Sequence, residues 1–209
     1  MENDRQLWQA FKQGDRHAYE QIYRLHVRVL YEYAYRFVVD KQFISDCLQD
    51  VFVDIWEKRE KLAETDHIQF YLIKALRNRI LRSLEKHKKW INADGQEENL
   101  PFQLIASVET LLIEEQQSQE LQQRLQQAIQ QLSERQKEAI YLRFYQNMSY
   151  EDIAAILEVE QQSAYNLIFR ALEVLRKKMN LSILAILILL HFLGKTVPKN
   201  HIYLILKKL

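Results

Sequence analysis

The scarcity of glycine and proline most constrains what this chain can fold into. Its 209 residues include only 3 Gly and 2 Pro. Sandwiches, barrels and dinucleotide-binding folds need sharp turns, and glycine supplies many of them. Glycine-rich phosphate loops are excluded too, because the three glycines are scattered at Gly14, Gly95 and Gly194. Composition therefore favours an all-α fold.

The residues that usually carry catalysis or bind metals are sparse. A single cysteine, Cys47, excludes an internal disulfide framework and cysteine-based zinc sites. The six histidines have no metal-ligand spacing. We therefore expect neither an enzyme nor a metal or other cofactor. The N-terminus lacks the basic-then-apolar order of a secretory signal peptide, which predicts a cytoplasmic protein.

Apolar residues in the first 90 positions recur every three or four residues, the spacing of amphipathic helices. The stripes predict helices from about residue 15 to 37, over 43–59 and over 67–88. Three such stripes can bury one another in a compact bundle. The sequence therefore predicts a first helical domain over residues 1–90, followed by a linker over 91–119.

Two capping signals organise the next part of the chain. Ser133 is followed by Gln136 and Ser149 by Asp152, the spacing of capping boxes. They predict helices over 134–146 and 150–157, after a glutamine-rich helix over 116–131. A longer helix follows the turn at 158–160, so residues 120–180 predict a helix-turn-helix domain. A three-helix bundle with a polar face is the alternative.

Residues 181–209 form an apolar tail. Thirteen of them, 181–193, are apolar except Ser182 and His191. As a helix this run would reach about 20 Å, short of the roughly 30 Å hydrocarbon core of a bilayer. A helix packed against protein is favoured, and a membrane-associated segment is the alternative because lysines flank the run.

The formal net charge of +1 hides an uneven distribution. Residues 74–89 carry seven basic residues and one acidic residue, whereas residues 90–129 carry one basic and seven acidic residues. On a helix the basic side chains form a ridge, with aromatic residues near both ends. That combination suits single-stranded or melted DNA, and a solvated helix face is the alternative.

The predicted helix over 43–59 carries acidic residues on one face, with Phe52 and Trp56 beside it. Such a face suits docking to a basic protein surface. The alternative is that Phe52 and Trp56 are buried in the hydrophobic core. The last predicted helix offers Gln, Asn and Arg side chains that can read base edges. Glu158 stands in the preceding turn, where a left-handed residue other than glycine costs about 1 kcal/mol.

Three motifs stand in a fixed order along the chain. They are Asp46-Cys-Leu-Gln49-Asp50-Val51-Phe52 followed by Trp56, Tyr71-Leu72-Ile-Lys74-Ala-Leu-Arg77-Asn78, and Ser149-Tyr-Glu-Asp-Ile153-Ala154. Together they resemble the extracytoplasmic-function group of bacterial sigma factors, in the sigma-70 family. The resemblance covers about residues 8–90 and 120–178. The chain departs from it at Glu158, where glycine is usual, and at Tyr165 and Leu167, where basic residues are common.

The resemblance implies an alternative sigma factor that binds core RNA polymerase and directs promoter recognition, DNA melting and transcription initiation, under control of an anti-sigma factor. The implied polymerase-binding residues are Asp46, Gln49, Asp50, Phe52, Val53 and Trp56. The −10 element would contact the 61–69 loop and Lys74, Arg77, Asn78, Arg79, Arg82 and Lys86. The −35 element would contact Arg143, Ser149, Gln162, Ser163, Tyr165, Asn166 and Arg170. The alternatives are a stand-alone helix-turn-helix regulator and a helical adaptor anchored by the tail.

Overall fold

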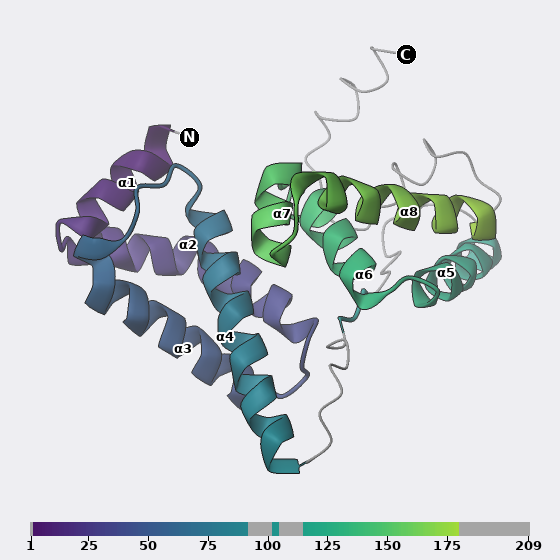
Figure 1. Cartoon of the computed structure of the whole chain (residues 1–209), viewed down its shortest axis with the longest axis horizontal. Helices are drawn as coiled ribbons and strands as arrows, with labels where there is room; N and C mark the ends of the chain where they lie inside the picture. Colours follow the sequence, from purple (N-terminus) through teal and green to yellow (C-terminus); the bar gives the residue numbers. More distant parts are fainter. Residues whose placement is uncertain (1, 92–101, 105–114, 180–209) are drawn as a thin grey trace. The chain divides into compact units, whose positions relative to one another are not determined.

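The computed structural model describes residues 2–91, 102–104 and 115–179, and its secondary structure there is helical, without a strand. The predicted all-α class is confirmed. Two compact units divide the chain: unit 1, Met1–Phe102, and unit 2, Gln103–Leu209 (Figure 1). The tail over 181–209 and most of the predicted linker lie outside the described residues. Within those residues no helix is long and apolar enough to span a membrane.

The described part of unit 1 contains four α-helices: α1 (Glu2–Lys12), α2 (Arg16–Tyr35), α3 (Lys41–Lys58) and α4 (Ile68–Ile91). Two aspartates fix helix starts, since Asp15 caps α2 and Asp40 caps α3, each accepting two backbone N–H groups. Helix α2 packs against the other three helices. The three helices predicted for this region are therefore present, each with bounds a few residues from those expected.

Helix α1 was not predicted, because it is short and has few apolar positions. Its Trp8 and Phe11 side chains are nonetheless fully buried. The Trp8 indole N–H donates to the Ala63 carbonyl oxygen at 3.0 Å, and Lys12 pairs with Glu64. Helix α1 therefore contributes to the core of unit 1, and its contacts stabilise the loop between α3 and α4.

A cluster of aromatic rings fills unit 1 between α1, α2 and α3. The Trp56 ring lies 4.9 Å from Tyr19 and 6.3 Å from Phe11, centroid to centroid. A second aromatic contact comes from beyond α4: Phe102 packs on Tyr33 and Phe37 at 6.1 and 5.0 Å. Unit 1 thus extends past its last helix to Phe102.

Unit 2 contains α5 (Glu115–Gln130), α6 (Glu134–Ile140) with a π-helical turn η2 (Tyr141–Tyr145), α7 (Tyr150–Leu157) and α8 (Gln161–Met179). Both predicted capping boxes form, at Ser133 with Gln136 and at Ser149 with Asp152. Helix α8 packs against α5, α6 and α7. Its buried positions include Ala164, Ile168, Ala171 and Leu175.

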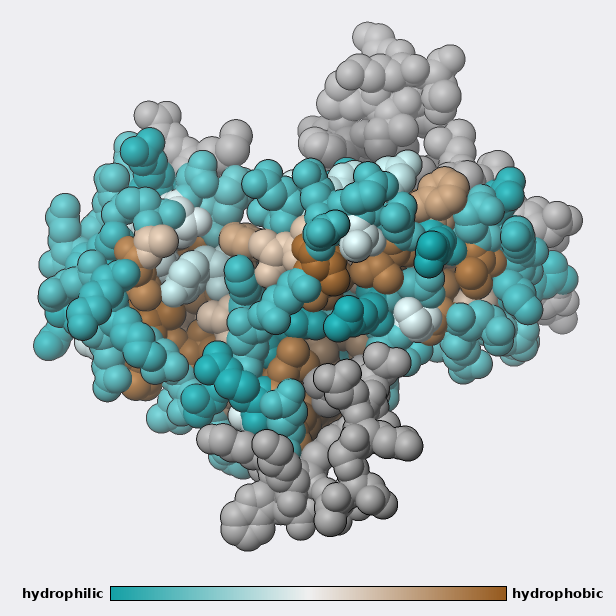
Figure 2. Space-filling model, viewed as in Figure 1, coloured by the Kyte–Doolittle hydropathy of each residue, from teal (hydrophilic) through white to brown (hydrophobic). Residues whose placement is uncertain are grey.

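The turn between α7 and α8 is left-handed at Glu158, with φ 55° and ψ 49°. The Glu158 backbone N–H donates to the Ala154 carbonyl oxygen, which closes the helix end. The side chain is exposed, so no packing compensates for the backbone conformation. A glutamate thus makes the turn in which glycine is expected. Figure 2 shows mostly hydrophilic side chains on the face in view, with patches of apolar ones among them.

Candidate functional site

The outward side of α3 carries the predicted polymerase-binding residues. Asp46, Gln49 and Val53 are exposed, and Val53 retains 45% of its accessible area. Asp46 accepts a hydrogen bond from the Gln42 side chain at 2.9 Å. Asp50 is half-buried at the edge of this face. An acidic surface with one exposed aliphatic side chain therefore runs along α3.

Phe52 is not on that surface, contrary to prediction. Its side chain is 3% exposed, with the ring 4.8 Å from Tyr23 and 6.3 Å from Tyr19. The Tyr19 hydroxyl donates to the Phe52 carbonyl oxygen at 3.1 Å, which ties α2 to α3. Trp56 is half-buried, with the Arg59 guanidinium 4.7 Å from its ring. The aromatic side of α3 is thus mainly core, the alternative left open by the sequence.

Helix α4 carries the predicted −10 residues, but they do not form one exposed ridge. Lys74, Asn78 and Arg79 are half-buried and Arg82 is exposed. Arg77 is only 7% exposed, so its predicted place on the ridge is wrong. It is buried because α4 packs on both α2 and α3, which widens the buried arc of the helix. The side chain of Lys86 lies outside the described residues.

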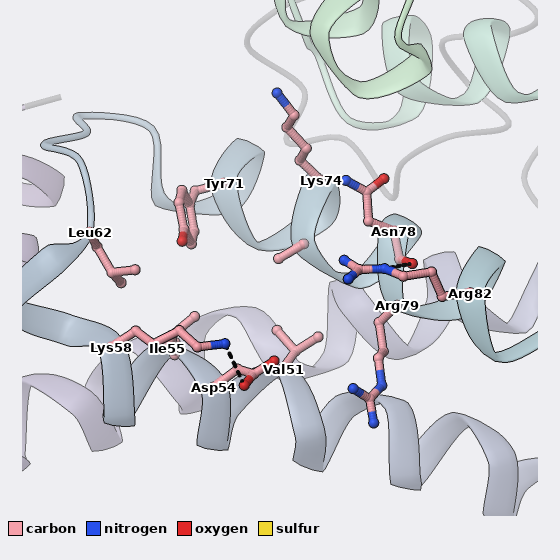
Figure 3. Close-up of a pocket in the computed structure, with 11 residues that line it drawn as sticks. Val51, Asp54, Ile55, Lys58, Leu62, Tyr71, Lys74, Asn78, Arg79 and Arg82 are labelled. Atoms are coloured by element: carbon pink, nitrogen blue, oxygen red, sulfur yellow. Dashed lines mark hydrogen bonds and ion pairs between the residues drawn. The ribbon is translucent and has the colours of Figure 1, made fainter.

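A cleft of about 270 Å³ lies between part of α3 and part of α4 (Figure 3). Asp54 and Lys58 line it from α3, while Lys74, Asn78 and Arg82 line it from α4. The Lys58 ammonium lies 2.8 Å from the Asp54 carboxylate. This hydrogen bond is the main cause that lowers the pKa of Asp54. The cleft therefore keeps fixed charges of both signs near neutral pH.

Two further side chains complete the cleft. Tyr71 lines one end, and burial raises the pKa of its hydroxyl, so the group stays neutral. Arg79 forms an ion pair with Asp50. This pair joins a predicted −10 residue to a predicted polymerase-binding residue, so the two predicted sites are in direct contact within unit 1.

In unit 2 the predicted −35 residues divide into two groups. Arg143 donates to the Met148 carbonyl oxygen at 2.7 Å and lies 4.8 Å from the Tyr150 ring. The Ser149 hydroxyl caps α7, accepting from the Asp152 N–H at 3.0 Å and donating to its carboxylate at 2.7 Å. These two residues thus have structural roles at the entry to the helix-turn-helix.

The second group lies on the exposed face of α8. Gln162, Ser163, Tyr165, Asn166 and Arg170 are all exposed there. The Gln162 amide donates to the Asn166 side-chain oxygen at 3.3 Å. The structure therefore gathers on one helix the side chains that can reach the edges of bases.

Phe169 is a further exposed residue on α8 that the motifs did not indicate: it is 50% exposed and stacks on Tyr165 with ring centroids 6.2 Å apart. Its position, four residues after Tyr165, is the signal that could have identified it. No group of three or more His, Cys, Asp or Glu that could hold a metal ion occurs within the described residues.

Two family matches account for both units. Residues 22–90 match the family Sigma-70 region 2, and residues 122–175 match Sigma-70, region 4. The chain belongs to the sigma-70 family. Regions 2 and 4 of this family bind core RNA polymerase and promoter DNA, so the chain is a sigma factor that directs promoter recognition. The sigma factor family is not a class of enzymes.

Solved structures agree at the level of the fold. The complex of CnrH with the cytosolic domain of CnrY matches with a TM-score of 0.56 and 20% identity, covering 85% of this chain and 97% of that chain. The complex of the sigma factor RpoE with the anti-sigma factor NepR from Bartonella quintana matches with a TM-score of 0.55 and 22% identity. That match covers 78% of this chain and 97% of that chain. No curated protein matches in sequence.

Proposed function

We propose that this sigma factor belongs to the extracytoplasmic-function group and binds core RNA polymerase through the outward face of α3. The observation that carries the proposal is the division of that helix. Asp46, Gln49 and Val53 are exposed, whereas Phe52 is buried in the aromatic cluster. Phe52 and Trp56 then fix the orientation of the helix, and the exposed side chains with Asp50 make the contact.

The −10 element is proposed to bind on the α4 side of the cleft. Lys74 and Arg82 supply positive charge for phosphates, and Asn78 supplies an amide for hydrogen bonds. Arg79 contributes together with Asp50, its ion-pair partner. Buried Arg77 has a supporting role within the helix packing. The 61–69 loop begins at the end of η1 (Arg59–Lys61), and contacts from α1 hold it.

The −35 element is proposed to lie against α8, with Arg143 and Ser149 supporting the entry to the motif. Gln162 and Asn166 offer amides that can pair with adenine, and Arg170 can bind guanine or phosphate. The polymerase supplies much of the affinity for DNA, because this unit has no large excess of positive charge. Residues 1–90, 91–119 and 120–180 are the proposed domain limits, with the tail beyond them.

Regulation by an anti-sigma factor is part of the proposal. The two solved structures compared above are complexes with a second protein, and one partner is named an anti-sigma factor. A partner that covers the outward face of α3 would compete with the polymerase. The protein is proposed to act in the cytoplasm, where the polymerase works, and to have no enzymatic activity of its own.

The test is co-purification with core RNA polymerase, followed by run-off transcription from a promoter library. Val53→Ala should weaken polymerase binding roughly three- to tenfold, because it removes apolar side-chain area that the proposed contact would take out of water. Val39→Ala is the matched control, since Val39 is also exposed but lies between α2 and α3. Equal effects of the two variants, or no association with polymerase, would contradict the proposal. Tight DNA binding by the chain alone would favour the stand-alone regulator.

A further inference from the structure

The exposed aromatic residues of unit 2 are concentrated on α8. Tyr165 and Phe169 are 46% and 50% exposed, and they are the large apolar side chains that stand out on the described surface of this unit. Their rings stack at 6.2 Å with an interplanar angle of 14°. Contact with a partner would remove part of this apolar area from water, which favours binding.

The Tyr165 ring is held in place before any partner arrives. Tyr150 on α7 lies 5.5 Å from Tyr165 and belongs to the same aromatic row. The Arg143 guanidinium lies over the other end of this row, 4.8 Å from Tyr150. The order is therefore Arg143, Tyr150, Tyr165, Phe169. Because neighbours restrict Tyr165, little rotamer freedom is lost when a ligand contacts its ring.

Polar groups flank the rings on the same helix. Gln162 and Asn166 form a hydrogen-bonded pair within one turn of Tyr165, and Arg170 follows Phe169 directly. A ligand that fits this surface offers hydrogen-bonding groups next to a small apolar group. In the major groove of DNA, the thymine 5-methyl group is the apolar feature among the donors and acceptors on the base edges.

We propose that Tyr165 and Phe169 recognise thymine methyl groups in the −35 element. The inference rests on the proposed function of unit 2 and deepens it by naming a base. Tyr165 stands where the family commonly has a basic residue, so this chain exchanges a charge contact for an apolar one at that position. Readout of thymine would then add to the amide contacts of Gln162 and Asn166.

The experiment removes the methyl group without altering base pairing. A promoter duplex is first selected from a randomised −35 library with the complete chain bound to core polymerase. A second duplex carries deoxyuridine in place of each thymine in the selected −35 element. We expect the complete holoenzyme to bind the deoxyuridine duplex about fourfold more weakly for each contacted methyl group.

Variants connect this difference to the two rings. Tyr165→Ala and Phe169→Ala should each reduce the preference for thymine over deoxyuridine, and both positions are exposed enough for the fold to tolerate the change. Tyr165→Phe keeps the ring and should keep the preference. Arg170→Ala is the matched control: it should weaken binding to both duplexes equally, because its proposed contacts do not involve the methyl group.

The outcomes separate the inference from the function on which it rests. Promoter selection with equal binding of both duplexes, or an unchanged preference in both alanine variants, would overturn the inference alone. Failure to select any promoter would overturn both. If deletion of 181–209 raised affinity for both duplexes and abolished the effect of the alanine variants, the rings would be a docking site for the tail, which would also overturn it.

Discussion

The two units differ in the side chains that they carry on the surfaces proposed for recognition. In unit 1 the rings of Trp8, Phe11 and Phe52 are buried between helices, and charged side chains line the cleft. In unit 2 the rings of Tyr165 and Phe169 are on the surface, beside amides and one arginine. The comparison supports the proposal that unit 1 recognises its partners through charged side chains held on packed rings. Unit 2 is proposed to use aromatic surface for recognition.

The largest expected effect tests the structural side of this comparison. Trp8→Ala should destabilise unit 1 by about 3–5 kcal/mol, because it leaves a large cavity and removes the hydrogen bond to the Ala63 carbonyl oxygen. Hydrogen exchange measured by mass spectrometry should show faster exchange in α1–α4 and unchanged exchange in α6–α8. Tyr165→Ala, at an exposed ring, should change stability by less than about 0.5 kcal/mol. Equal losses in both units would contradict the comparison.

The next effect concerns charge. Lys74→Ala should weaken holoenzyme binding to a single-stranded −10 oligonucleotide and reduce the slope of log K against log salt by about 0.7, the value for one phosphate contact on a single strand. Phe169→Ala should leave that slope unchanged in binding to duplex −35 DNA, since it removes no charge. Titrations over a range of salt concentrations measure both. A slope that changes for Phe169→Ala would mean that the two units do not differ in this way.

A smaller effect is expected at the left-handed turn. Glu158→Gly should stabilise unit 2 by about 1 kcal/mol, because glycine adopts a positive φ without steric cost. Thermal unfolding should show this as a rise of about 4–8 °C for a unit of this size. Glu158→Ala has the same backbone restriction and should give no such rise. A gain shared by both variants would assign the effect to the removed charge.

The smallest effect is on pH dependence, and it belongs to unit 1. His26 is buried, and burial lowers its pKa, with Asp4 acting in the opposite direction. The unfolded chain therefore takes up this proton at a higher pH than the folded unit does. The contribution of neutral His26 to the free energy of unfolding is fully present above the ordinary histidine pKa of about 6.5. This contribution is lost progressively as the pH falls below that value. Denaturant unfolding at pH 7 and pH 5.5 should show the loss, and His26→Leu should reduce it.

Local signals in the sequence predicted much of the fold. The capping boxes at Ser133 and Ser149 and the three helices predicted from stripes in unit 1 are confirmed because caps and helical periodicity act over a few residues. Arg77 was placed wrongly, since its burial depends on two neighbouring helices. Helix α1 was missed because two large rings, Trp8 and Phe11, supply most of its packing. Contacts between distant segments determine such features, and periodicity alone does not reveal them.

The candidate sites were less predictable than the helices. The sequence could identify charged and polar residues on α3, α4 and α8, but not their partners. The Asp50–Arg79 ion pair joins residues 29 positions apart in the chain. The sequence also does not show that the Tyr165 and Phe169 rings are both exposed and stacked. Side-chain partners across helices therefore decide which predicted residues face outward and which support the packing.

Phe102 has a practical consequence for work with fragments of this protein. A fragment cut at the end of α4, after Ile91, would lack the ring that packs on Tyr33 and Phe37. Both side chains would gain contact with water, and exposed aromatic area of that kind promotes self-association. A fragment of unit 1 prepared for crystallisation or binding assays should therefore end after Phe102 and not at its last helix.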